Sequence, residues 1–388
     1  MSRRRAFRYC ALGVAVLGAA LAFFGALRTP GELAFAYLAA LGCVASTLVG
    51  ALALLAMMQL LDARWFVVLC RICLALTTPT ASLPLLFLPI ALMVRWIYPW
   101  AGSLIATPES TAPTARAQLF GHPWLGAWPF LLRASLYLLV WIAIAEAFRR
   151  SARASDQRAE SWFLKSRAAI SALSLPALGC SGTWAAFDWL MSAVPSWNMT
   201  SVGLYFLSGG FASALGVLAL LVHIARAGGR LPCEVGVAHC LALGRLLFAA
   251  VCLWAYIAVS QLIIVWSADL PREAAFYVPR ARGGWRYLAA LLIFGHFVVP
   301  FLLLLSRKWK ESSGFLAGVG AWIAAMHAID LYWLMVPSAC VTPSILDTGP
   351  FLLLAALAVL IGALRSGNEP LVPLHDPELA RSLGYQSP

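Results

Sequence analysis

The sequence has few charged residues. Asp, Glu, Lys and Arg make up 11% of its 388 residues, whereas 62% are hydrophobic, and the mean hydropathy is +0.84. A soluble domain contains about 25% charged residues, and a soluble fold cannot hide this much apolar surface. A soluble enzyme, a disordered chain and a secreted disulfide scaffold are therefore excluded. Alternating ten-residue strands of a membrane barrel are also lacking, so the long apolar runs predict an all-α polytopic transmembrane bundle.

The chain also lacks the common motifs of catalytic and metal sites. It contains no glycine-rich phosphate loop, nucleophile elbow or zinc motif. Cys70 and Cys73 form a C-x-x-C pair, but no His follows Cys73, which excludes covalent haem attachment. We interpret both as packing residues. Four further cysteines are expected to be small buried hydrophobes: Cys10, Cys43, Cys180 and Cys252.

Paired histidines raise the alternative of haem ligation inside the membrane. His223 and His239 flank one loop at similar depth, and His296 could face His327. However, two of the six histidines lie in a loop and in the tail, so a pattern of four ligands at matched depths is missing. We therefore expect no cofactor and no metal.

Ten apolar runs are long enough to span a membrane, which takes about 20 residues. We expect a single integral membrane domain over residues 1–388, with 366–388 as a cytoplasmic tail. The third run contains Pro79, Pro84 and Pro89, which predict a kinked or broken helix. The predicted spans are 6–27, 33–61, 65–93, 128–148, 168–192, 199–225, 238–266, 285–305, 314–336 and 349–365.

The basic residues predict the orientation of these spans. With both termini in the cytoplasm, the inside segments hold 18 Lys and Arg, the outside loops hold 7, and three lie within spans. Basic residues accumulate in cytoplasmic loops, so both termini are predicted to be cytoplasmic. The net charge of +12 is thus a topology signal, and no nucleic-acid partner is expected. The outer loop at 94–127 is predicted to lie on the membrane surface or against a partner.

Several polar residues fall at membrane depth, where ionisable groups are costly and often functional. Asp188, Tyr256, Ser260, Gln261, His296, His327, Asp330 and Tyr332 lie in the middle and outer parts of their spans, and Glu146, His223 and His239 lie near the inner side. A structural alternative stays open, in which Asp188 caps a helix or pairs with Arg133 and the inner group lies at the headgroups.

The residue types suit a proton relay, which needs groups that change charge within one water of each other. We expect Asp188, His296, His327 and Asp330 to converge in the bundle interior as an outward-facing half-channel. Tyr256 and Ser260 would carry hydrogen bonds between them. Glu146, His223 and His239 are the only candidates for an inner half.

Five strings in the same order resemble the ActF subunit of bacterial alternative complex III, which is related to NrfD-like anchors of polysulfide-reductase-type enzymes. The resemblance covers most of the chain and is weak before residue 65. The strings are WAAFDWLMSAVPSW at 184–197, GRLLFAAVCLWAYIAVSQLIIVWSADLPRE at 244–273, GGWRYLAALLIFGHFVVPFLLLLSRKWK at 283–310, AIDLYWLMVP at 328–337 and PLVPLHDPELARSL at 370–383.

The resemblance implies two four-helix bundles plus flanking helices, in a subunit of a quinol-oxidising complex that holds no redox centre itself. The implied partners are an NrfD-like quinol-binding subunit, an iron–sulfur subunit, c-type cytochrome subunits, small membrane subunits, a terminal oxidase and lipid. The working quinol site belongs to the sister subunit, so we expect no tightly bound quinone here. Residues that match the family's motifs are Asp188, Tyr256, Ser260, Gln261, His296, Asp330 and Tyr332.

The sequence departs from the family pattern at a few positions. Val194 and Ser196 replace an acidic residue and a His, Arg245 stands where Lys is usual, and the third span has Arg71 but no Glu. The missing carboxylate weakens the case for a complete inner proton path and is compatible with a diverged paralogue. Two other function classes stay open: a stand-alone secondary transporter and a purely structural anchor.

Overall fold

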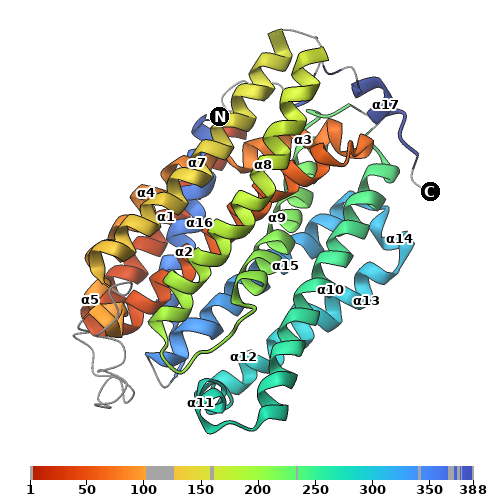
Figure 1. The fold of residues 1–388 in the computed structure, drawn as a ribbon. Helices are drawn as coiled ribbons and strands as arrows, with labels where there is room; N and C mark the ends of the chain where they lie inside the picture. Colours follow the sequence, from red (N-terminus) through yellow and green to blue (C-terminus); the bar gives the residue numbers. More distant parts are fainter. Residues whose placement is uncertain are drawn as a thin grey trace.

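The computed structural model consists of long helices packed side by side (Figure 1). It describes residues 3–101, 126–157, 161–232, 235–339, 342–365, 371–373, 376 and 378–386. Ten segments of 21 to 32 residues are apolar enough to cross a membrane. At 1.5 Å per residue each segment is long enough for a hydrocarbon core of about 30 Å. The prediction of an all-α polytopic membrane bundle with ten spans is confirmed.

The first bundle contains the second to the fifth spans. These are α2 (Pro30–Leu60), a broken third span, α7 (Ala127–Gln157) and α8 (Ser161–Ala185), which continues into the π-helical segment η4 (Ala186–Leu190) and the 3-10 turn η5 (Met191–Ala193). The third span is divided into η1 (Arg64–Leu69), α3 (Cys70–Leu76), η2 (Thr78–Ser82) and α4 (Leu83–Leu92). The breaks occur around Pro79 and Pro84, which cannot donate backbone hydrogen bonds, as the sequence predicted.

The second bundle contains the sixth to the ninth spans. They are α9 (Val202–Ala227), α10 (Val237–Ala268), the composite span α12 (Trp285–Leu291), η6 (Leu292–Val298) and α13 (Val299–Leu305), and α15 (Ser313–Met335). The segment η6 is π-helical. Helices α2 and α9 join the two bundles, because Gly210 of α9 lies so close to the Ser46 backbone that a Cβ would not fit.

The first and last spans flank the bundles. Helix α1 (Arg3–Arg28) packs against α16 (Thr348–Arg365) where Gly18 and Gly349 allow the two backbones to approach closely. Small residues support such close packing in membranes. Shorter pieces lie between the spans: α5 (Val94–Ile97), η3 (Pro99–Ala101), α11 (Pro271–Arg280), α14 (Arg307–Lys310), η7 (Val336–Ser338) and η8 (Ile345–Asp347). One more, α17 (Leu379–Leu383), lies in the C-terminal tail.

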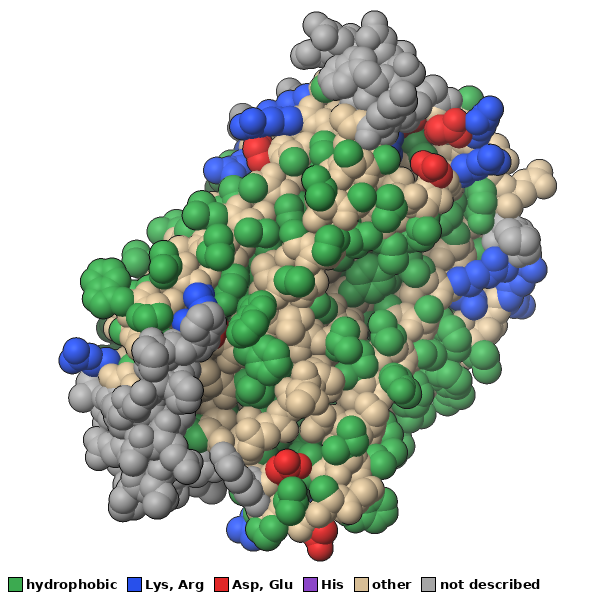
Figure 2. All heavy atoms as spheres, viewed as in Figure 1, with side chains coloured by type: hydrophobic (Ala, Val, Ile, Leu, Met, Phe, Trp, Pro, Cys, Tyr) green, Lys and Arg blue, Asp and Glu red, His purple; other side chains and the backbone are tan. Residues whose placement is uncertain are grey.

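Both termini lie at the same end of the molecule (Figure 1), as an even number of spans requires. Hydrophobic side chains cover the middle of the visible face, and charged side chains gather toward the ends (Figure 2). Cys10 and Cys180, expected to be buried, are exposed on the bundle surface. Lipid can solvate a thiol as well as protein can, so an apolar run does not show which of its residues face the interior. Most of the predicted outer loop at 94–127 lies outside the described residues.

Candidate functional site

Asp330 is the centre of a buried polar cluster in the second bundle. Its carboxylate accepts hydrogen bonds from the Tyr205 hydroxyl of α9 at 2.5 Å and from the Trp254 indole of α10 at 3.1 Å. Asp330 is 0% exposed, and Tyr205 and Trp254 are also buried. Three helices thus bring their polar groups to one carboxyl group.

His327 lies one turn before Asp330 on α15 and belongs to the same cluster. Its Nε2 atom is 2.8 Å from the Ser46 hydroxyl of α2. Gly209 of α9 makes room for the ring, because a Cβ at this position would lie 2.8 Å from His327 Nδ1 and 3.4 Å from Trp254 Cδ1. A side chain at position 209 would therefore displace the imidazole.

His296 completes the set, which we call the Asp330 cluster: Ser46, Tyr205, Trp254, His296, His327 and Asp330. The His296 ring is fully buried and lies against the Trp254 ring, with centroids 3.8 Å apart. Neither of its nitrogens has a hydrogen-bond partner among the described residues. The Trp254 indole is thus in contact with one histidine, next to another, and bonded to the acid.

Asp188 forms a second group in the first bundle, the Asp188 cluster. Arg133 of α7 binds its carboxylate with two N–H donors at 2.7 and 2.9 Å, and the Tyr137 hydroxyl donates at 2.8 Å. All three side chains are largely buried. The pairing of Asp188 with Arg133, which the sequence left open as a structural alternative, is therefore present. A bidentate pair of this kind is among the strongest side-chain interactions.

Asp188 and His296 share an unusual local backbone. Both lie in π-helical segments, η4 and η6, and such bulges often occur at functional sites. In each segment an aromatic side chain from another element donates to a backbone carbonyl: Tyr98 to Trp189 at 3.0 Å, and Trp322 to Gly295 at 2.7 Å. These bonds satisfy carbonyls in the irregular segments, which would otherwise be costly in a membrane. Burial and the nearby Asp188 carboxylate raise the pKa of Tyr98 well above its ordinary value.

The two clusters are separate. Leu190 and Leu331, the near neighbours of Asp188 and Asp330 in the chain, both pack over Gly42 of α2. Within the described residues no hydrogen bond links Asp188 to Asp330. Each acid is bonded to partners of its own bundle, so the predicted convergence of Asp188 with the other three residues stays a prediction.

Helix α10 does not supply the expected connecting residues. Tyr256 is 72% exposed on the bundle surface, and the Ser260 hydroxyl donates to the Ile257 carbonyl of its own helix. Tyr256 lies on the outer face of α10 and Ser260 bonds within its own helix, so neither is seen to link the acids among the described residues. Gln261 is buried and accepts a bond from Ser201 at 3.3 Å. Tyr332 donates to Asp347 at 2.8 Å, so it anchors the turn before α16.

Among the described residues, the inner candidates are not hydrogen-bonded to one another. Glu146 binds Arg149 and Arg150 of its own helix, as expected for an interfacial residue. His223 Nδ1 is 3.2 Å from the Ser313 hydroxyl. His239 Nε2 is 3.0 Å from the Ser382 carbonyl of the C-terminal tail. The structure thus joins each histidine to a different partner.

The sequence reasoning missed residues that are central to both clusters. Ser46, Tyr205 and Trp254 hold the Asp330 cluster together, and Tyr137 completes the Asp188 cluster. Their residue types are common in membrane helices, so nothing in one sequence distinguishes them. Arg280 was counted as a loop residue, yet it is buried and donates to the Leu334 carbonyl and the Ser338 hydroxyl at the end of α15.

The two acids differ in charge balance. Asp188 is neutralised by Arg133, whereas the partners of Asp330 among the described residues are neutral donors. A carboxyl group without a bound cation can gain or lose a proton without breaking an ion pair.

No group of three or more His, Cys, Asp or Glu in the described part of the chain is arranged to hold a metal ion. No protein-family model matches the chain, and no curated protein matches it significantly.

Proposed function

We propose that this protein is a membrane subunit of a quinol-oxidising electron-transfer complex of the alternative complex III type, and that the Asp330 cluster is its proton half-channel. The observation that carries the proposal is the fully buried Asp330, whose hydrogen-bond partners among the described residues are the neutral donors Tyr205 and Trp254. Buried His327 lies one turn before it on α15, and buried His296 packs on Trp254. Ionisable groups are rare at membrane depth unless they have a function. The resemblance at 184–310 is to a subunit of a quinol-oxidising complex, in which proton movement would accompany quinol oxidation.

The cluster offers a route for a proton on the side away from the termini. Tyr205 lies in the first turn of α9, close to that end of the bundle, and its hydroxyl contacts the Asp330 carboxylate. A hydroxyl can donate to one neighbour and accept from another, so Tyr205 can pass a proton to Asp330. From there His327 and Ser46 extend toward the middle of α2.

The route does not continue across the inner half. Beyond Ser46, the next hydroxyl pair is Thr47 and Ser213, at 2.9 Å. From Ser213 to His223 α9 rises by about 15 Å, and the residues between them that face the interior include Leu215, Leu218 and Val222. This apolar layer supports a half-channel that stores or exchanges a proton at Asp330. It does not support full transmembrane pumping through this chain alone.

The Asp188 cluster is assigned a structural role in this proposal. Its ion pair fastens η4 to α7, and this arrangement holds the irregular end of the fifth span in place.

The proposed partners are the NrfD-like quinol-binding subunit, the iron–sulfur subunit and the c-type cytochromes, in a bacterial cytoplasmic membrane with both termini inside. The quinol would react in the sister subunit, and this chain would take part in the associated proton movement.

Purification from the native membrane tests the proposal. A tag on this chain should co-isolate iron–sulfur and multihaem cytochrome subunits, and the isolated complex should oxidise quinol. A solitary and stable protein would favour the transporter alternative. If Asp330→Asn leaves the activity and the proton release of the complex unchanged, the chain is a structural anchor.

A further inference from the structure

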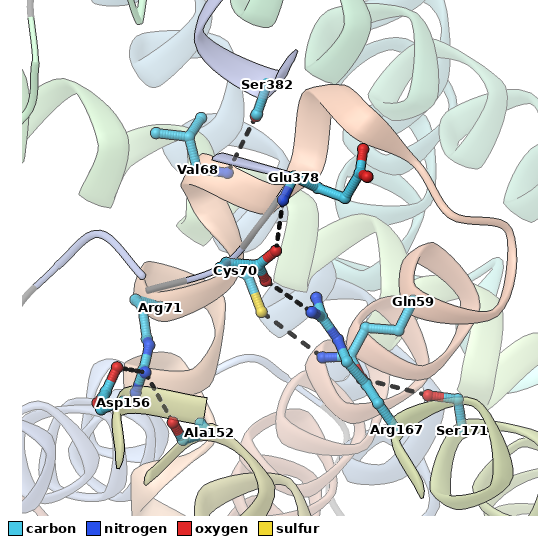
Figure 3. Close-up of polar contacts among 11 residues, drawn as sticks. Gln59, Val68, Cys70, Arg71, Ala152, Asp156, Arg167, Ser171, Glu378 and Ser382 are labelled. Atoms are coloured by element: carbon cyan, nitrogen blue, oxygen red, sulfur yellow. Dashed lines mark hydrogen bonds and ion pairs between the residues drawn. The ribbon is translucent and has the colours of Figure 1, made fainter. Parts of the chain in front are cut away.

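The C-terminal tail is bound to the inner end of the first bundle (Figure 3) and also contacts the second bundle. Asp376 binds Arg167 of α8 at 2.7 Å, and its other carboxylate oxygen accepts the Glu378 backbone N–H at 3.0 Å. Ser382 is fully buried, and its hydroxyl accepts the Val68 backbone N–H of η1 at 3.2 Å. These bonds fasten the tail to the first bundle.

The same serine also contacts the second bundle. The Ser382 carbonyl lies 3.0 Å from His239 Nε2, and the Tyr385 ring lies 5.9 Å from the His239 ring. A carbonyl oxygen can only accept, so Nε2 carries the hydrogen and Nδ1 has a lone pair. This Nδ1 atom is buried and has no hydrogen-bond partner among the described residues.

A small cavity lies beside His239, the residue that the Ser382 carbonyl of the tail contacts. Its volume is about 10 Å³, and its walls include His239, Ser313 and Leu69, together with apolar residues of α9, α10 and α15. Leu69 follows Val68, which the tail binds. A single water needs a space of about 10–15 Å³ and at least two polar partners. The volume is at the lower limit of the first condition, and the cavity walls carry the polar side chains of His239 and Ser313.

We propose that this cavity is a binding site for one water molecule, held between His239 Nδ1 and the Ser313 hydroxyl, and that the C-terminal tail is the latch that closes it. The water donates one hydrogen to His239 Nδ1 and bonds to Ser313, which continues to His223 at 3.2 Å. A hydrogen-bonded chain then runs from the Ser382 carbonyl to His223. When the tail is docked, this chain is shielded from bulk water.

The latch depends on Asp376, because it is the buried anchor that lies nearest along the chain to Ser382. Removing the charge of Asp376 leaves the Arg167 guanidinium buried without its ion-pair partner, which weakens the attachment of the tail to α8. Glu378 is the matched control, because it lies two residues away, is more exposed and pairs with Arg381 within the tail. The proposal is independent of the quinol complex, because it concerns only the tail, the cavity and its walls.

Hydrogen exchange of the full chain in lipid nanodiscs tests the latch. Asp376→Asn should speed exchange of peptides that contain Val68 and His239 by tenfold or more, and Glu378→Gln should leave them unchanged. If Asp376→Asn does not accumulate, Ser382→Ala removes the acceptor of the Val68 N–H alone and should speed exchange at Val68. Unchanged exchange in the accumulating variant, or equal changes in the Glu378 control, would overturn the latch.

An electron cryomicroscopy map fine enough to show ordered water tests the site itself. Density is expected between His239 and Ser313 in the parent protein and should be lost in Ser313→Ala. An empty cavity in the parent, or density that persists in Ser313→Ala, would overturn the assignment. Both measurements can fail while the complex that contains this chain still oxidises quinol, so they are separate from the test of the proposed function.

Discussion

Arg133 holds Asp188 in a bidentate pair, with donor–acceptor distances of 2.7 and 2.9 Å, although the two residues are 55 positions apart. The pair crosses from α7 to the π-helical end of the fifth span, and Tyr137 satisfies a further lone pair. Removing one partner of a buried ion pair leaves the other charge without compensation. Asp188 is thereby distinguished from Asp330, which has neutral partners.

The first prediction concerns the stability provided by this pair. Asp188→Asn should destabilise the protein by about 3–5 kcal/mol because Arg133 becomes a buried, uncompensated cation. The measurement is the thermal unfolding of the purified protein in detergent. The double variant Arg133→Gln with Asp188→Asn should recover most of the loss, as coupled residues do. A single variant as stable as the parent would show that the pair contributes little.

The second prediction concerns Asp330. Asp330→Asn keeps the shape of the side chain, and its amide oxygen can still accept a hydrogen bond, so the stability should fall by no more than about 1–3 kcal/mol. Quinol-dependent proton translocation by the complex should drop at least tenfold, because an amide cannot carry a proton. Proton translocation at the parent level would contradict the proposed half-channel. Tyr332→Phe, outside the Asp330 cluster, is the control for effects on α15.

The third prediction uses the space beside His327. Gly209→Ala would place a methyl group 2.8 Å from the imidazole, which should displace the ring, break its bond to Ser46 and cost about 1–3 kcal/mol. The control is Gly318→Ala on α15, where a Cβ meets no atom within 4 Å; it should be neutral or stabilising by up to about 1 kcal/mol. Thermal unfolding of the two variants compares them directly. Equal stability of both would mean that the His327 pocket can rearrange freely.

The fourth prediction concerns orientation. A reporter that is active only in the periplasm should stay inactive when fused after Pro388, because the 18-to-7 distribution of basic residues favours both termini in the cytoplasm. A reporter active only in the cytoplasm should be active at the same position. The reverse pattern would show that the bundle has the opposite orientation, with the Asp330 cluster toward the other side of the membrane.

The sequence alone determined the fold class and the number of spans. Apolar runs of about 20 residues cross a membrane as helices, because a helix bonds its backbone groups within the segment, so composition and length were sufficient. The prolines of the third span also predicted a break, because proline removes a backbone donor wherever it occurs. The residue types of the candidate site, above all Asp188, His296 and Asp330, were visible for the same reason: charge is rare and costly at this depth.

Only the tertiary structure decided which of those residues meet. A uniformly apolar helix has no polar face, so the sequence does not show whether Tyr256 points outward or inward, and it points outward. Trp254 and Tyr205 bind Asp330 from two other helices, an arrangement set by the rotation of each helix in the packed bundle. Ser382 likewise reaches Val68 across 314 positions of chain. Close approaches at small residues such as Gly209 and Gly210 fix these rotations, because packing between helices, and not the apolar pattern along each one, selects a single arrangement in a membrane.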